Sequence, residues 1–137
     1  MYEEIEETIN LQLDFLKLEK IQNNLKNTEV IPVAVQNSEN KEVLLVAYVN
    51  KEALDYSIKN KIATFWSTSR NELWVKGKTS GDYLELIEIR VNCEQNSLLF
   101  LVKPKKGVCH TRDKDGNTRR TCFYRKIELL KKELKII

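Results

Sequence analysis

Residues 30–50, VIPVAVQNSENKEVLLVAYVN, decide how the middle of this chain folds. Two apolar runs rich in β-branched residues, VIPVAVQN (30–37) and EVLLVAYVN (42–50), flank the polar tetrapeptide SENK. Short apolar runs separated by a polar turn are typical of a β-hairpin. Asn50 can then cap a short helix through KEALDYSIKN (51–60). The stretch therefore predicts two antiparallel strands followed by a helix.

Further strands are expected after this helix, because apolar runs alternate with turn residues such as Arg70-Asn71 and Ser80-Gly81. The runs are IATFWSTS (62–69), LWVKGKT (73–79), YLELIEIRVNC (83–93) and SLLFLVKP (97–104). At the N-terminus, residues 3–26 have acids in the first turn and Ile5, Ile9 and Leu16 at roughly helical spacing. At the C-terminus, residues 126–137 carry one apolar helical face, formed by Ile127, Leu130, Leu134 and Ile137.

These patterns predict one α+β domain over residues 1–137, built mainly on antiparallel sheet with an N-terminal, a short middle and a C-terminal helix. The composition, 42% apolar and 31% charged, is that of an ordinary globular protein. The acidic start MYEEIEETIN does not resemble a signal peptide, and no apolar run is long enough to span a membrane. We therefore expect a cytoplasmic protein with reduced thiols and neither a membrane nor a nucleic-acid partner.

Positive charge is concentrated near the C-terminus although the net charge is only +3. Between residues 103 and 126, nine Lys and Arg face only Asp113 and Asp115. Such a surplus suits a phosphate-bearing ligand. A solvated loop whose charges confer solubility is the alternative interpretation.

Three cysteines and the single histidine are the candidates for site chemistry. Cys93 ends a predicted strand, and Cys109 and Cys122 bracket the basic loop, with His110 directly after Cys109. No C-x-x-C pair occurs, and the zinc deaminase signature is missing. Spacing alone leaves two interpretations open: buried small apolar residues or metal ligands.

If the thiols bind metal, three thiolates select zinc and leave a fourth position for His110 or water. Neighbouring side chains of an extended chain point to opposite faces, so Cys109 and His110 do not easily converge on one ion. Ligation by the three cysteines with His110 beside an open position is the more economical geometry. Zinc lowers the pKa of water at an open position towards about 7, and a nearby imidazole can move protons. This geometry predicts a hydrolase site.

Six blocks of the chain occur in the order found in one enzyme family. They are IPVAVQN, VLLVAYVNKEAL, FWSTSRNELWVKGKTSG, EIRVNC, CHT and TCFYR. Over roughly residues 13–126 the chain therefore resembles phosphoribosyl-AMP cyclohydrolase of histidine biosynthesis, with residues 1–12 as an N-terminal helical extension. The resemblance implies hydrolysis of the N1–C6 bond of the adenine ring of N1-(5-phosphoribosyl)-AMP. It also implies zinc on Cys93, Cys109 and Cys122, and His110 as the catalytic histidine.

The resemblance further implies a homodimer whose zinc sites take ligands from both chains, the alternative being a monomer with all three cysteines in one chain. The substrate is a purine nucleotide with two phosphates, so we expect phosphate contacts from basic residues, hydrogen bonds from hydroxyls and stacking from tryptophans. The tryptophans could instead pack in the core. The candidates for these contacts are Trp66, Ser67, Ser69, Arg70, Trp74, Lys76, Lys78, Thr79, Ser80 and Arg125.

Two departures from the family pattern bear on the cofactor and the substrate. The family places magnesium on Asp-Cys-Asp-x-Asp, whereas this chain has Asn92, Glu94 and Asn96 at the acidic positions. Neutral amides bind a hard cation more weakly than carboxylates, so magnesium is doubtful unless other acids such as Asp82 or Glu85 contribute. The loop between the last two cysteines is also longer here, with Arg112 in place of a glycine and a turn at KDGN.

Three hypotheses follow from the sequence. The first is a phosphoribosyl-AMP cyclohydrolase with altered magnesium use. The second is a related zinc hydrolase that acts on another purine nucleotide selected by the basic loop. The third is a non-catalytic nucleotide-binding protein with a closed Cys3His zinc site.

Overall fold

The computed structural model describes residues 2–24, 29–78 and 81–137. In chain order, its elements are α1 (Tyr2–Glu7), α2 (Lys17–Asn24), β1 (Ile31–Asn37), β2 (Val43–Val49), α3 (Lys51–Asn60), β3 (Thr64–Ser67), β4 (Glu72–Val75), β5 (Leu84–Val91), β6 (Leu98–Pro104), β7 (Arg125–Glu128) and β8 (Glu133–Ile136). None of the helices in these ranges is long and apolar enough to cross a membrane.

A four-stranded sheet in the order β2-β1-β6-β5 forms the centre of the molecule. The predicted hairpin of β1 and β2 is confirmed, with a bulge between Val35 and Gln36. The fold class as predicted is wrong, however, because the sheet is mixed and the helices are few and short. Strands β1 and β6 run parallel, with Val33 opposite Leu98. More than 60 residues of chain separate these two residues, and apolar alternation does not encode which distant strands pair.

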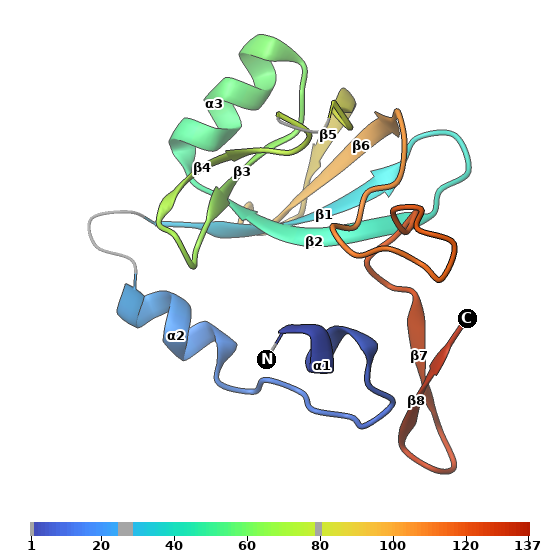
Figure 1. Cartoon of the computed structure of the whole chain (residues 1–137). Helices are drawn as coiled ribbons and strands as arrows, with labels where there is room; N and C mark the ends of the chain where they lie inside the picture. The colour runs from blue at the N-terminus through green and yellow to red at the C-terminus, as the bar shows by residue number, and fades with distance from the viewer. Residues whose placement is uncertain (1, 25–28, 79–80) are drawn as a thin grey trace.

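Helix α3 and the β3–β4 hairpin cover one face of this sheet, as Figure 1 shows. The predicted cap is confirmed: the Asn50 side chain accepts a hydrogen bond of 2.8 Å from the Ala53 amide. The buried Ser57 hydroxyl joins α3 to β3, because it accepts a bond from the Thr64 amide at 2.9 Å. The rings of Phe65 and Phe100 stack beneath with centroids 6.0 Å apart. The hydrophobic core therefore lies between α3, β3 and the sheet.

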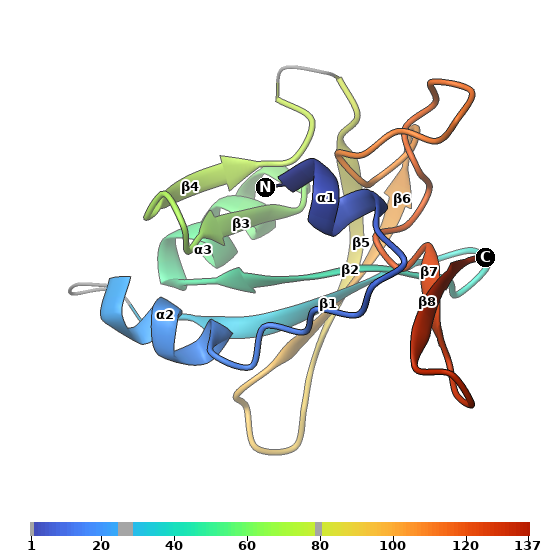
Figure 2. The same ribbon diagram turned by 60° about the horizontal axis from the view of Figure 1, so that its bottom comes forward.

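The single N-terminal helix predicted for residues 3–26 is replaced by two short helices, α1 and α2. Polar side chains between them bond to nearby backbone, which competes with helix continuation. Thr8 accepts a bond from the Asn10 amide at 3.0 Å, and Asp14 accepts one from the Leu16 amide at 3.1 Å. The N-terminal segment lies on the side of the sheet away from α3 (Figures 1 and 2).

The predicted C-terminal helix is wrong, because residues 125–136 form the antiparallel hairpin β7–β8. Ile127 pairs with Leu134, and Leu129 and Leu130 are exposed in the turn, at 86% and 94%. A helix of this length is marginal unless it packs on a surface. The hairpin is instead bonded to the N-terminal segment, because the Leu134 amide donates a hydrogen bond to the Ile9 carbonyl at 2.8 Å.

Candidate active site

The basic loop that joins β6 to β7 is itself a small hairpin. The amides of Val108 and Cys109 both donate to the Arg119 carbonyl at 3.0 Å. The predicted turn at its tip is confirmed: Gly116 has φ +83, and Asp113 accepts from the Asp115 and Asn117 amides at 2.9 and 3.0 Å. At the base, a Cβ on Gly107 would lie 2.2 Å from the Thr118 hydroxyl, so only glycine lets the two arms close.

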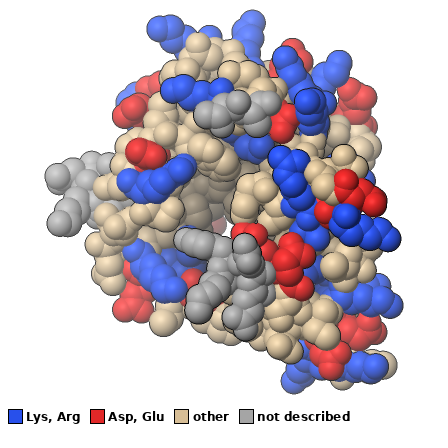
Figure 3. Space-filling view, viewed as in Figure 1, with Lys and Arg blue, Asp and Glu red and all other residues tan. Residues whose placement is uncertain are grey.

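The end of this loop is fixed to strand β2. The Cys122 amide donates to the Leu44 carbonyl at 2.7 Å, and the Thr121 hydroxyl donates to the Val43 carbonyl at 2.8 Å. Arg120 forms a bidentate ion pair with Glu42 at 2.6 and 2.9 Å. Lys and Arg side chains are conspicuous on the right of the molecule, where this loop and the C-terminal hairpin lie, but acidic side chains are mixed among them (Figure 3).

The closed loop brings the thiols of Cys109 and Cys122 together. A hydrogen bond from Cys122 lowers the pKa of Cys109, against the opposing effect of burial. The Thr111 hydroxyl, 3.0 Å from the Cys109 sulfur, lowers this pKa further. The same bond to Cys109, together with burial, raises the pKa of Cys122. The pair is therefore biased toward one thiolate on Cys109, and thiolates are the form in which cysteines bind zinc.

Both cysteines line one cavity of about 310 Å³ together with His110 and the predicted contact residues Trp74 and Lys76. Trp74 lies in β4, and Lys76 follows directly after the last residue of that strand, Val75. The Trp74 ring also packs against Phe65, with centroids 5.5 Å apart. Lys76 is buried, and its positive charge acts on Cys122. The cavity thus combines thiols, an imidazole, a cation and an aromatic ring.

His110 lies at the edge of this cavity, with its side chain 78% exposed. Its Nε2 atom is 2.6 Å from the Glu6 carboxylate of helix α1. Sequence reasoning missed Glu6, because no pattern links two residues 104 positions apart. The cavity is also lined by Asp82 and Arg112. The sequence suggests Asp82 only as a possible magnesium ligand, and it marks Arg112 as part of the basic surplus and as the residue in place of a glycine in the longer loop.

Cys93 is not brought to the other two cysteines. It is exposed in the turn that joins β5 to β6. The Cys122 amide is bonded to Leu44 of β2, and β2 is two strands, or about 10 Å, from β6 across the sheet. Leu44 is also about three residues, or roughly 10 Å, along the sheet from the position level with the start of β6, where the Cys93 turn ends. Within the described ranges, no group of three His, Cys, Asp or Glu side chains is arranged to hold a metal ion. A single chain therefore presents two of the three predicted zinc ligands together.

The degenerate magnesium positions occupy the same turn as Cys93. The Asn92 side chain donates to Asn96 Oδ1 at 2.6 Å and accepts from the Asn96 and Ser97 amides, both at 2.9 Å. Gln95 takes a left-handed conformation with φ 57. The two amides thus hold the turn, and Glu94 supplies its only carboxylate.

The remaining predicted contact residues that the structure describes are not among those lining the cavity. Trp66 bonds to Asn71 at 3.1 Å, and Arg70 bonds to Ser67 at 3.3 Å, both around the β3–β4 turn, which also includes Ser69. Lys78 is exposed beyond β4. Arg125 donates to the Ile5 and Thr8 carbonyls at 2.8 and 2.9 Å. Two further candidates, Thr79 and Ser80, fall outside the described residues.

A profile of the phosphoribosyl-AMP cyclohydrolase family matches residues 45–124, which include α3, the β3–β4 hairpin and the entire basic loop. The chain belongs to the phosphoribosyl-AMP cyclohydrolase family. The resemblance stated from the sequence is thereby confirmed, and the family's name denotes a hydrolase of a C–N bond.

Curated relatives carry the same name. The phosphoribosyl-AMP cyclohydrolase of Archaeoglobus fulgidus is 46% identical over 99 residues, covering 72% of this chain and 86% of the relative. That of Methanosarcina acetivorans is 42% identical over 118 residues, covering 86% and 87%. That of Nitrosopumilus maritimus is 39% identical over 103 residues, covering 75% and 90%.

Proposed function

We propose that this protein is a phosphoribosyl-AMP cyclohydrolase that hydrolyses the N1–C6 bond of the adenine ring of N1-(5-phosphoribosyl)-AMP, as a step of histidine biosynthesis. Family membership, with relatives of that name covered over most of their length, is the observation that carries the proposal. The cavity at Cys109, Cys122 and His110 supports it, because it combines metal-binding thiols with a group that can move protons.

Zinc fits the residues of this cavity as far as one chain supplies them. Cys109 and Cys122 would hold the ion. Zinc binding requires thiols that lie close together and are deprotonated, and here the two thiols are in contact and the lowered pKa of Cys109 favours its thiolate. When bound, zinc supplies Lewis-acid activation of water. His110 follows Cys109 directly and faces Glu6, which supports a role beside the metal rather than on it.

The third ligand, in this proposal, is Cys93 of a second copy. Cys93 is exposed and distant from the Cys109–Cys122 pair of its own chain, so it is available to a neighbouring molecule. A homodimer with two such sites would complete three thiolates at each of them. Assembly and metal binding would then depend on one another.

Other side chains of this chain would bind the substrate and transfer protons. Lys76 and Arg112 would bind phosphate of the substrate, and Trp74 would contact a base. His110 would accept a proton from the water that adds to C6 and return it to N1 as the C6–N1 bond breaks, so that C6 becomes a carboxamide carbon. The second proton of this water leaves the C6 hydroxyl for the solvent as the carbonyl forms, and the positive charge of the substrate ring leaves with it, so that atoms and charge balance.

The direct test is an assay of the pure, zinc-loaded protein with N1-(5-phosphoribosyl)-AMP, in which ring opening is followed by loss of purine absorbance and by mass. We expect turnover with this substrate and little with AMP or adenosine, whose adenine rings carry no N1 substituent and are therefore not cationic. Turnover of another purine nucleotide alone would favour the second hypothesis. Binding of nucleotide without turnover would favour the third.

A further inference from the structure

The N-terminal arm, which we define as residues 5–13, is bound to the C-terminal hairpin and to the basic loop. Tyr124 donates its hydroxyl proton to the Glu6 carbonyl at 2.8 Å, and Arg125 binds the carbonyls of Ile5 and Thr8. The Leu134 amide bonds to Ile9. Four backbone carbonyls of the arm are thus bonded, which fixes where its side chains lie.

Two neighbouring acids of the arm reach the loop that carries the candidate site. Glu7 binds Arg119 with both carboxylate oxygens, at 3.1 and 3.4 Å. The Arg119 guanidinium in turn stacks on the Tyr124 ring, 4.0 Å from its centroid. This pair anchors α1 to the loop. Glu6, one residue earlier, is directed at the His110 ring with 2.6 Å between Oε1 and Nε2.

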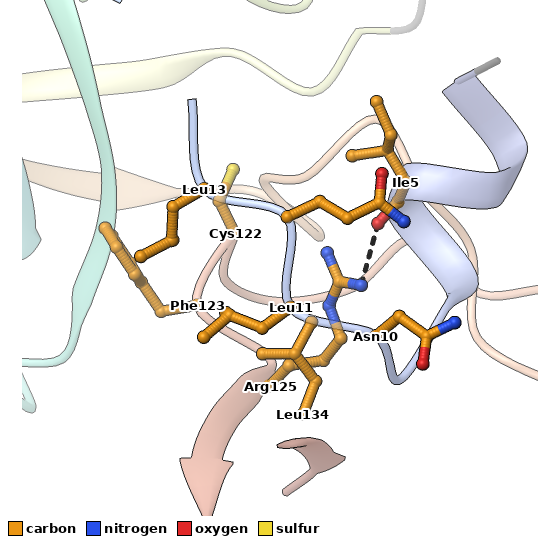
Figure 4. Close-up of a pocket in the computed structure, with 9 residues that line it drawn as sticks. Ile5, Asn10, Leu11, Leu13, Cys122, Phe123, Arg125 and Leu134 are labelled. Carbon is orange, nitrogen blue, oxygen red and sulfur yellow. Dashed lines mark hydrogen bonds between the residues drawn. The ribbon is translucent and has the colours of Figure 1, made fainter. Parts of the chain in front are cut away.

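The arm also meets the site from its other side. Ile5, Leu11 and Leu13 line a second cavity of about 190 Å³ together with Cys122 and Phe123. Figure 4 shows these side chains lining one pocket with Cys122, and Arg125 bonded to the Ile5 backbone. The arm therefore lies beside Cys122 and, through Glu6, beside the histidine that follows Cys109. The arm lies outside residues 45–124, so it is an addition to the part that the family profile matches.

We propose that Glu6 is a positioning residue for His110, held in place by the N-terminal arm. A carboxylate accepts, so Nε2 must carry the proton of the Glu6–His110 bond. In the neutral ring Nδ1 then keeps the lone pair, and Nδ1 is the atom that can take a proton from water. Glu6 also holds an otherwise exposed ring in one orientation. The carboxylate thereby selects the tautomer, as carboxylates do for histidines in other active sites.

This inference rests on the proposed function for the role of His110, but its central observation does not need turnover. The chain has one histidine, so a single set of imidazole signals reports on it. Long-range ¹H–¹⁵N correlation spectra of the full-length, zinc-loaded protein show which ring nitrogen carries the proton. We expect Nε2 in the wild type. In Glu6→Ala we expect a mixture of both tautomers.

The kinetic readouts are kcat and KM for N1-(5-phosphoribosyl)-AMP. Glu6→Ala should lower kcat about tenfold or more with KM changed less, because a group that orients a catalytic residue acts on the chemical step. Glu6→Gln keeps a carbonyl oxygen that can accept from Nε2 and should retain more of kcat. Asp14→Asn is the matched control: it removes an acid of the same N-terminal segment whose partner is Lys20, at 3.0 Å, and should change neither the tautomer nor kcat.

Three results would overturn the proposal: a proton on Nδ1 in the wild type, a Glu6→Ala variant with unchanged tautomer and kcat, or a Glu6→Ala variant that is faster. The last result would make the arm inhibitory. If Glu6→Ala does not fold, the wild-type spectrum and Glu6→Gln decide the matter. A wild type that is inactive on the substrate yet protonated on Nε2 would refute the proposed function and leave the position of Glu6 standing.

Discussion

Cys93 and Cys122 lie at separate places on the central sheet. Cys93 is in the β5–β6 turn, whereas the Cys122 amide is bonded to Leu44 of β2, two strands beyond β6. Strand spacing and rise place the two residues much farther apart than the few ångströms that separate two ligands of one zinc ion. Either the three cysteines do not share a metal, or two chains build each site.

The first prediction concerns the metal content. Protein purified without added zinc should contain close to one zinc per chain, and Cys122→Ser should lose most of it, because a missing thiolate weakens a three-thiolate site. Metal analysis after gel filtration measures this. Thr111→Val is the matched control, since it removes the hydroxyl 3.0 Å from the Cys109 sulfur without removing a ligand. Full zinc retention in Cys122→Ser would exclude Cys122 as a ligand.

His110→Ala should keep its zinc and lose activity by about a hundredfold or more, the effect expected for a lost general acid–base group. Zinc content and kcat are measured on the same preparation. Loss of zinc together with the imidazole would instead indicate a closed Cys3His site, and with it a binding protein rather than an enzyme.

Magnesium should activate this protein weakly. Asn92 and Asn96 carry no charge and are engaged with each other and with the turn, which leaves Glu94 as the turn's only carboxylate. A hard divalent cation binds weakly to such a set. Activity titrated with magnesium at saturating zinc gives the answer. Saturation at micromolar magnesium would contradict the expectation and direct attention to Asp82, Glu85 or the substrate phosphates.

The ion pair that fixes the loop to β2 should give stability that depends on pH. The Arg120 guanidinium, through its hydrogen bond, lowers the pKa of Glu42 in the folded chain. A lowered folded-state pKa means that the stabilisation is present above the unfolded pKa of about 4.3 and is lost as pH falls through the folded value. Glu42→Gln should therefore reduce the free energy of unfolding near neutral pH. The difference should be no more than about 1 kcal/mol, because Arg120 is largely exposed.

Urea unfolding of wild type and Glu42→Gln at pH 7 and at pH 3 measures this difference. The gap between the two proteins should shrink at pH 3. Glu39→Gln, at an exposed glutamate of the β1–β2 turn, is the control and should follow the wild type at both values. A gap that is equal at both pH values would show that the carboxylate charge of Glu42 contributes nothing.

Local patterns predicted the parts of the fold that local interactions determine. The hairpin of β1 and β2, the Asn50 cap and the turn at Gly116 each depend on a few neighbouring residues. The helix predicted for residues 126–137 is wrong because the spacing of its apolar residues is compatible with either a helix or a hairpin. Ile127 and Leu134 would share one face of a helix, but they also lie opposite one another in the hairpin. The bond from Leu134 to Ile9 favours the hairpin, and no local pattern contains it.

The candidate site shows the same division. Residue type and spacing made Cys109, His110 and Cys122 candidates, the family resemblance implied their roles, and the loop hairpin brings the two thiols together. Trp74 and Lys76 line the cavity, whereas Arg70 and Trp66 do not. Arg70 is in the turn of the β3–β4 hairpin, and Trp66, opposite Leu73, is on the other face of the hairpin from Trp74, which is opposite Phe65. Glu6 could not be found, since its approach to His110 depends on how the arm docks on a distant hairpin.

The measurement that tests the shared site most directly is complementation between two inactive variants. Cys93→Ser and Cys109→Ser chains are each prepared alone, mixed, and allowed to exchange subunits, which mass spectrometry confirms. In a heterodimer with shared sites both lesions can fall in one site, which leaves the other intact and restores up to half of the wild-type activity per heterodimer. That recovery is the result we predict. Absence of recovery after confirmed exchange, or a monomeric mass with zinc bound, would contradict a site built from two chains.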